Sequence, residues 1–237
     1  PTRRSSDLKN KEYTVKTGDL TLFNPHDNHN CKQVDGGTLD YRCINIEPAV
    51  MKKVAYEITG KDYLPYFTET VLFSSDLLSS LSELHHMIMH EEKDFKKEEI
   101  LLLIIEQLIA EYDHAGAALT TQPPNTEIKA VCDFLENNYM KSITLNDLSD
   151  LTGISKYYLL RSFTKQKGIS PYCYLETIRI GNAKKLLEQQ IAPIDVALQT
   201  GFTDQSHFTN FFKKLIGLTP KQYMNIFTEG SRRSGNE

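Results

Sequence analysis

The chain carries one pattern twice near its C-terminal end, first as Phe163-x4-Gly168-Ile169-Ser170-Pro171-x2-Tyr174 and again as Phe212-x4-Gly217-Leu218-Thr219-Pro220-x2-Tyr223. Upstream of these stretches, Ser149-x3-Gly153 matches Ala197-x3-Gly201. The copies are offset by 48 residues before this glycine turn and by 49 residues after it, so the second copy has one extra residue where two helices meet. Two amphipathic helices joined by a sharp turn that contains glycine are typical of a helix-turn-helix.

The first copy has local signals for both of its helices. Thr144 can cap the first helix, and Asp147 follows three residues later, as in a capping box. Gly153 permits the sharp turn, and Ser155 can cap the second helix. In the second copy, Thr203 or Asp204 has the corresponding capping role. We therefore expect two helix-turn-helix units.

The second helix of each unit is expected to point its polar side chains outward, where they can meet DNA. Glutamine and asparagine pair with adenine edges, arginine pairs with guanine, and apolar atoms contact thymine methyl groups, whereas lysines position the protein on phosphates. For the two tyrosines of the first unit, packing in the domain core is the alternative. The candidate DNA contacts are Ser155, Lys156, Tyr157, Tyr158, Leu160, Arg161 and Lys165 in the first unit and Asp204, Gln205, Ser206, His207, Thr209, Asn210, Lys213 and Lys214 in the second.

A long helix should separate the two units. Ser170-Pro171 is a strong start signal, and the helical pattern runs to about Gln189. Such a helix spans ~30 Å, close to the ~34 Å of one DNA turn. A rigid spacer of this length could place two reading helices in successive segments of the major groove.

Composition agrees with a sensor joined to a nucleic-acid binder. The net charge of −4 divides into −7 for residues 1–124, with 13 Lys and Arg against 20 Asp and Glu, and +3 for residues 125–237, with 14 against 11. No run of about 18 apolar residues is present, so we expect no membrane partner. The four cysteines have no zinc-ligand spacing, and we find no secretory signal, which favours reduced, cytosolic thiols.

The N-terminal half mixes strand and helix patterns. Tyr13 to Cys31 alternates and turns like β structure, and Leu39 to Ile46 fits a further strand after the Gly36-Gly37 turn. From Pro48 the periodicity becomes helical. The expected helix faces consist of Met51, Val54, Ala55 and Ile58, then Leu77, Leu81, Leu84 and Ile88, and then the apolar segment Glu98 to Tyr112.

That last segment is apolar around much of its circumference, so it must be buried on several sides. It can pack on its own domain or pair with a second chain, and periodicity does not separate the two. The residues that would form a dimer interface are Leu101, Ile104, Ile105, Leu108 and Tyr112.

Histidines offer only a weak case for a metal. His26 and His29 lie near a possible third ligand, Glu47, and His86 and His90 are spaced i,i+4 on an expected helix. Neither group has further ligands at regular spacing. We expect hydrogen-bonded or solvated histidines, no metal site, no catalytic residue and no cofactor.

The C-terminal half resembles the DNA-binding domain of AraC/XylS-type transcription regulators, over about a hundred residues. The resemblance implies a seven-helix domain with two helix-turn-helix subdomains joined by a long helix, with RNA polymerase as a partner. His207 stands where the family usually has tyrosine, Asn210 where arginine is common, and Ser149 where alanine is usual. The matching motifs are Leu148-Ser149-x3-Gly153-x-Ser155-x3-Leu159-x-Arg161-x-Phe163, Gly168-x-Ser170-Pro171-x2-Tyr174-Leu175-x3-Arg179-x3-Ala183-x2-Leu186-Leu187, and Ile194-x-Val196-Ala197-x3-Gly201-Phe202-x-Asp204-x-Ser206-x-Phe208-x3-Phe212-Lys213-Lys214-x2-Gly217-x-Thr219-Pro220-x2-Tyr223.

The N-terminal half more loosely resembles the cupin-like sensing domain of the same family. Lys16-x-Gly18-Asp19-Leu20-x-Leu22-x2-Pro25-x3-His29 looks like its mid-barrel hairpin, and Glu98 to Tyr112 looks like its dimerisation helix. The expected fold class is therefore α+β, with a partial cupin-like barrel and helices followed by an all-α domain.

We expect five segments. Residues 1–8 resemble one reading frame of a sequencing adapter and are expected to be non-native, which would truncate the sensing domain. A linker rich in glycine, threonine and proline separates the two domains. The segments are 1–8, the sensing and dimerisation domain 9–112, the linker 113–125, the DNA-binding domain 126–228 and the tail 229–237.

The leading hypothesis is a transcription regulator, working as a homodimer on a double-stranded DNA operator and controlled by an unidentified small-molecule effector in the N-terminal half. Such control requires that the effector bind one state of the protein better than the other. One alternative is a cupin-type metalloenzyme or metal sensor fused to a DNA-binding domain, and bound metal would favour it. Another is an architectural binder without sequence preference, which a large affinity ratio for one operator would exclude.

Overall fold

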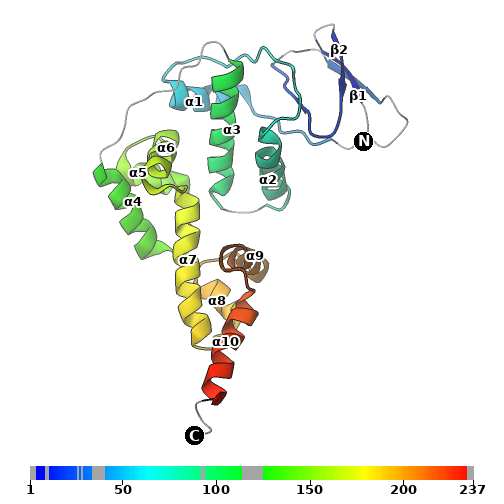
Figure 1. Ribbon diagram of the computed structural model, residues 1–237. Helices are drawn as coiled ribbons and strands as arrows, with labels where there is room; N and C mark the ends of the chain where they lie inside the picture. Colours follow the sequence, from blue (N-terminus) through cyan, green and yellow to red (C-terminus); the bar gives the residue numbers. More distant parts are fainter. Residues whose placement is uncertain are drawn as a thin grey trace. The chain divides into compact units, whose positions relative to one another are not determined.

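The computed structural model describes residues 4–8, 11–25, 27, 29–33, 41–91, 94–113 and 125–233 (Figure 1). The chain forms two compact units. Unit 1 comprises Pro1–Glu92 and Lys96–Gln122, and unit 2 comprises Lys93–Phe95 and Pro123–Glu237. The segment boundaries expected from the sequence remain a prediction.

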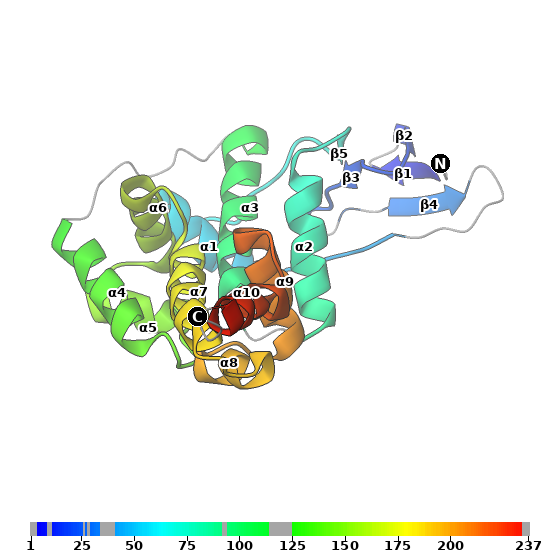
Figure 2. The same cartoon turned by 60° about the horizontal axis from the view of Figure 1, so that its bottom comes forward.

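The strands of unit 1 form two small antiparallel sheets (Figure 2). In one, β1 (Arg4–Leu8) lies between β2 (Lys11–Val15) and β4 (His29–Gln33). In the other, β3 (Leu20–Thr21) pairs with β5 (Val71–Leu72). The strands that the structure describes do not close into a barrel, so only the coarser part of the expected fold, a helix-rich chain with few strands, is found.

The strand expected over Leu39 to Ile46 is wrong for the residues described, because residues 41–47 are irregular. Ile44 and Ile46 are half-buried and their neighbours are exposed, so the alternation is present without the strand. Alternation is a property of one segment, whereas a strand also needs a partner edge to satisfy its backbone groups. No strand in the described part of the chain pairs with this segment.

Three helices complete unit 1: α1 (Pro48–Thr59), α2 (Leu77–Met89) and α3 (Lys96–Tyr112). Helix α3 packs against both α1 and α2. The expected face of α1 is correct, since Val54, Ala55 and Ile58 are buried. On α2 the buried face turns from the expected one, because Met87 is buried while Ile88 is 46% exposed.

Most leucine and isoleucine side chains of α3 are buried, and α3 packs against α1 and α2 of the same unit. Ile104, Ile105 and Leu108 are buried, and Leu101 and Tyr112 are half-buried. Burial of this kind accounts for the sequence pattern without a second chain, because apolar side chains leave water wherever a packed neighbour is available. The dimer interface expected from these residues stays a prediction.

Unit 2 is helical, and α7 runs along its length (Figure 1). Helices α4 to α6 surround one end of α7, and α8 to α10 surround the other. Helix α7 is therefore shared by two similar groups of helices, which we call the first and second subdomains. Their helices are α4 (Asn125–Asn138), α5 (Leu145–Thr152), α6 (Lys156–Lys167), α7 (Pro171–Glu188), α8 (Pro193–Gln199), α9 (Gln205–Ile216) and α10 (Pro220–Arg233).

The sequence repeat is also a repeat of ring contacts. In the first subdomain, the rings of Phe163 and Tyr174 meet edge to face with centroids 5.5 Å apart and an interplanar angle of 73°. In the second, Phe212 and Tyr223 meet with centroids 5.5 Å apart at 70°. The phenylalanine closes the reading helix onto the helix that follows it in each copy, so the motif is a packing unit.

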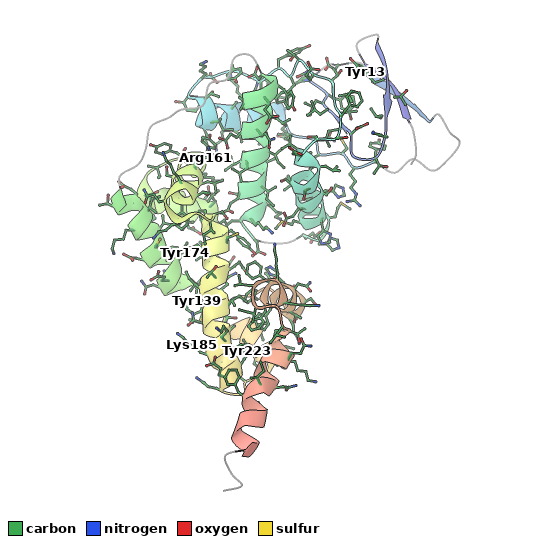
Figure 3. All side chains as sticks on the ribbon, viewed as in Figure 1. Tyr13, Tyr139, Arg161, Tyr174, Lys185 and Tyr223 are labelled. Carbon is green, nitrogen blue, oxygen red and sulfur yellow. The ribbon has the colours of Figure 1, made fainter. Side chains whose placement is uncertain are left out.

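The same tyrosines also tie each subdomain to the helix that precedes its helix-turn-helix. The Tyr174 hydroxyl donates to Glu136 of α4 at 2.6 Å, and the Tyr223 hydroxyl donates to Glu188 of α7 at 2.8 Å. Figure 3 marks Tyr174 in the first subdomain and Tyr223 in the second. Helix α7 is thus the last helix of the first subdomain and the first helix of the second.

The helix starts expected from the sequence are confirmed. Thr144 and Asp147 form a complete capping box at α5, and the side chains of Ser155 and Ser170 cap α6 and α7. Of the two candidates at α9, Asp204 is the cap. Each cap satisfies a backbone N–H that the first turn of a helix leaves without a partner.

No helix of the described residues is long and apolar enough to cross a membrane.

Candidate nucleic-acid interface

Helix α9 presents a polar outer face at its N-terminal end. The Asp204 carboxylate accepts a hydrogen bond from the His207 backbone N–H at 2.7 Å, which holds the first turn. Gln205, Ser206 and Asn210 are exposed, as expected, and Thr209 is half-buried. Phe208 and Phe212 are completely buried on the opposite side. The outer face of α9 is therefore rigidly held and rich in groups that can donate to and accept from base edges.

His207 is half-buried, unlike its exposed neighbours on α9. Its ring meets Phe202 edge to face at 5.5 Å, its Nε2 lies 3.4 Å from the Tyr172 hydroxyl, and its Nδ1 lies 3.5 Å from Thr203 Oγ1. The side chain expected to read DNA thus also packs against the helix-turn-helix turn and against α7.

Lysines end the second reading helix. Lys213 and Lys214 are exposed in its last turn, where they also complement the negative end of the helix dipole. Gly217 ends α9 in the left-handed conformation, with φ of +85°. The lysine positions suit contacts to phosphate oxygens better than base readout.

Helix α6 matches the expectation only in part. Arg161 and Lys165 are exposed, and Lys156 and Tyr158 are half-buried (Figure 3 marks Arg161). Ser155 acts as the cap, with its hydroxyl 3.3 Å from the Tyr158 backbone N–H.

Tyr157 and Leu160 correct the expectation for α6, since both were expected to face outward and both are buried, at 2% and 0% exposed. They lie three residues apart on one helical face, and a pair of apolar side chains there is stabilised by leaving water. Helical periodicity does not distinguish a reading face from a packing face. Neither side chain presents an outer surface to a base edge in this structure.

A buried ion pair on α7 was not expected as part of the site. Glu176 and Arg179 are 0% and 3% exposed, and Arg179 Nη1 lies 3.2 Å from Glu176 Oε1. Burial raises the pKa of Glu176, and the Arg179 charge opposes that rise. The sequence signal for Arg179 was its place in the family motif, whereas Glu176 had no local signal.

The described residues hold no group of three or more histidine, cysteine, aspartate or glutamate side chains suited to a metal. His90 Nδ1 lies 2.8 Å from the His86 backbone oxygen, and the two rings are 3.9 Å apart. Of the other expected candidates, His26 and the His29 side chain lie outside the described residues.

Unit 1 contains an open hollow of about 450 Å³ beside β5 and the C-terminal half of α3. Its lining residues include Glu69, Asp76, Gln107 and Glu111.

Comparisons with known proteins match both units. Residues 148–226 match the family model described as a helix-turn-helix domain, and residues 3–108 match the AraC-like ligand binding domain. The chain is 56% identical over 199 residues to the HTH-type transcriptional regulator YbfI of Bacillus subtilis, which covers 84% of this chain and 72% of that protein.

Two further matches cover smaller parts. The bifunctional transcriptional activator/DNA repair enzyme AdaA of Bacillus subtilis is 29% identical over 116 residues, which are 48% of this chain and 55% of that protein. The C-terminal domain of the two-component response regulator yesN from Fusobacterium nucleatum is 34% identical, with a TM-score of 0.40, and covers 43% of this chain and 99% of that one. The match to a regulator over most of both chains, together with the two family models, is decisive: the chain belongs to the AraC/XylS family of DNA-binding transcription regulators.

Proposed function

We propose that this regulator recognises operators with two half-elements, one read by α6 and the other by α9, in successive segments of the major groove. The observation that carries the proposal is the repeated helix-turn-helix around a shared α7. Helix α7 has 18 residues, which corresponds to ~27 Å of helix. That length is close to the ~34 Å pitch of DNA.

Base readout is assigned to the exposed polar side chains of the two reading helices. Arg161 suits a guanine edge, and Gln205 and Asn210 suit adenine edges. Lys156, Lys165, Lys213 and Lys214 are assigned to phosphates, and Tyr158, Ser206 and Thr209 to local contacts around them. Ser155 and Asp204 act as caps, and His207 supports the reading helix from its inner side. Tyr157 and Leu160 are assigned no contact with DNA, because both side chains are buried.

The experiment is a selection of bound sequences from random duplex DNA with the full chain. A single motif with two half-elements about a helical turn apart is the expected result. Salt-sensitive binding to every sequence, with no motif recovered, would contradict the proposal, because phosphate contacts alone give affinity without sequence preference.

We further propose that a small-molecule effector binds within unit 1, folded as a cupin-like sensing domain, and shifts the population of DNA-binding states. The match of residues 3–108 to an AraC-like ligand binding domain supports this assignment. An effector can shift the equilibrium only by its difference in affinity for the two states. The expected finding is a compound that raises the melting temperature and changes operator affinity by the same factor by which the operator changes the affinity for the compound.

Two chains and RNA polymerase complete the proposed assembly, in the bacterial cytoplasm where the operator lies. The outer face of α3, where Leu103 is 39% exposed, is the part of the expected dimer helix left for a second chain. Sedimentation equilibrium of the full chain tests the dimer. We propose that the protein controls transcription without an enzymatic step. The names of the relatives support this, except that AdaA is also a DNA repair enzyme. Stoichiometric metal in the purified protein would contradict it.

A further inference from the structure

The turns of the two helix-turn-helix units correspond in sequence but have different surroundings. Gly153 and Gly201 occupy matching positions and both adopt positive φ, of +70° and +83°. A Cβ atom at Gly153 would have nothing within 4 Å. At Gly201 it would lie 2.7 Å from the Tyr139 carbonyl oxygen and 2.9 Å from the Met140 Cα and carbonyl oxygen. The second turn therefore presses against the backbone that follows α4 in the first subdomain.

Arg179 of the shared helix α7 hydrogen-bonds to the same stretch of backbone. Its Nε donates to the Tyr139 carbonyl oxygen at 2.8 Å, and its Nη2 donates to the Lys141 carbonyl oxygen at 3.1 Å. Its Nη1 donates to Glu176 at 3.2 Å, so one planar guanidinium is held by three fixed acceptors. Arginine can satisfy such an arrangement because its donors form a rigid fork, which lysine lacks.

The second subdomain also contacts this guanidinium, through the ring of Phe202. Phe202 follows Gly201, is 4% exposed, and places its ring centroid 5.8 Å from Arg179 Cζ. Residues Tyr139–Lys141 are thus contacted by Arg179 and approached by the Gly201 turn. We call the set Tyr139–Lys141, Arg179 and Gly201–Phe202 the junction. Figure 3 marks Tyr139 beside the middle of α7.

The junction supplies a constraint that a connecting helix does not supply by itself. Long helices bend, and two subdomains seated at opposite ends of one can rock against each other. A backbone contact as close as that at Gly201 resists approach of the two subdomains, and the arginine hydrogen bonds resist their separation. Separating Arg179 from Glu176 would leave a buried charge without its partner, which is strongly unfavourable. The ion pair therefore favours the one arrangement in which Arg179 keeps all its contacts.

We propose that the junction fixes the angle and separation of α6 and α9, so that the spacing between the two operator half-elements determines specificity. The inference rests on the proposed function. Arg179 and Gly201 are positioning residues that are largely withdrawn from the reading surface. They act on DNA only through the relative placement of the two reading helices.

The test uses the full chain and synthetic duplexes built from the selected motif, with base pairs inserted or removed between the half-elements. Each added base pair moves one half-element by ~3.4 Å and turns it by roughly a tenth of a helical turn. For the natural chain we expect affinity to fall about tenfold or more for one added base pair, comparable to a mismatch in the site. We call the affinity at the natural spacing divided by the affinity with one added base pair the spacing ratio. For Gly201→Ala we expect a spacing ratio below about three, or tightest binding at a different spacing.

Gly153→Ala is the matched control. It introduces the same side chain at the same kind of positive φ, with open space around it. It is expected to lose stability through the backbone strain alone and to keep the spacing ratio of the natural chain. Identical spacing ratios for the natural chain, Gly153→Ala and Gly201→Ala would overturn the inference.

Arg179→Lys is a second variant that retains the charge beside Glu176 and loses the fork. Folding is checked by far-UV circular dichroism, and this variant decides the question if Gly201→Ala does not fold. A relaxed spacing ratio supports the junction, and an unchanged ratio refutes it. Absence of any sequence preference in the natural chain would instead refute the proposed function, and the inference with it.

Discussion

At Ser149, one hydroxyl spans the turn of the first helix-turn-helix. Its Oγ donates to the Ile154 carbonyl oxygen at 2.6 Å, across the left-handed Gly153. The second copy of the motif has alanine at the matching position, Ala197. The serine thus adds a hydrogen bond to the first turn, through an acceptor five residues further along the chain.

Ser149→Ala should lower the free energy of unfolding by about 1 kcal/mol, because it leaves the half-buried turn without that donor. Urea unfolding of the full chain measures the change. Ser206→Ala, at an exposed position, is the control and should stay within about 0.5 kcal/mol of the natural chain. Equal values for the two variants would refute the role assigned to this hydroxyl.

Arg161 and Lys213 should separate the two kinds of DNA contact. Arg161→Ala is expected to weaken operator binding by about 1–3 kcal/mol and to relax the preference at one base pair. Lys213→Ala should weaken binding to all sequences about equally and reduce the salt dependence. Titrations of the operator and of single-substitution duplexes at several salt concentrations measure both effects. Indistinguishable profiles would contradict the assigned roles.

At the scale of elements, Tyr223 fastens α10 to α7 by a hydrogen bond and to α9 by a ring contact. The Tyr223 hydroxyl donates to Glu188, and its ring meets Phe212. Partial burial and the hydrogen bond to Glu188 raise the pKa of Tyr223 to about 12. In the unfolded chain the tyrosine ionises near its ordinary pKa of about 10. Its contribution to stability is therefore complete below pH ~10 and is lost as the pH rises toward 12.

Tyr223→Phe tests this linkage, because it removes the ionisable hydroxyl and retains the ring. The natural chain should be more stable than the variant at pH 9, and the difference should shrink as the pH rises from 10 to 12. Urea unfolding at a series of pH values measures it. A constant difference over that range would show that ionisation of this tyrosine has no part in holding α10.

At the scale of the whole molecule, unit 2 has a core of its own. In its second subdomain, α7 contributes Ile180, Ala183 and Leu187, which pack with residues of α8 and α9. In its first subdomain, Ile128, Leu135 and other apolar side chains are buried. A segment with its own apolar core and capped helices should fold without the rest of the chain.

Residues 123–237 expressed alone should therefore unfold in a single cooperative thermal transition. Far-UV circular dichroism follows the melt, and proton–nitrogen correlation spectra report whether the packing is unique. A gradual melt with collapsed spectra would mean that this unit depends on the remainder of the chain.

Local chemistry let the sequence by itself determine much of unit 2. A capping box such as Thr144 and Asp147 needs only atoms three residues apart, and Ser170-Pro171 acts on the helix that it begins. The matching positions of Phe163 and Phe212 identify the repeated unit from the sequence alone. Helix boundaries and the existence of two reading helices followed from these signals.

The tertiary structure decided whatever depends on a partner far along the chain. Arg179 meets carbonyl oxygens 38 and 40 residues away, and Gly201 meets the same stretch, although the periodicity around either residue is that of an ordinary helix or turn. The burial of Tyr157 and Leu160 and the absence of a strand over residues 41–47 have the same cause. Residue type sets what a side chain or a backbone segment is able to do, and only the neighbours that folding brings to it determine which of those possibilities is realised.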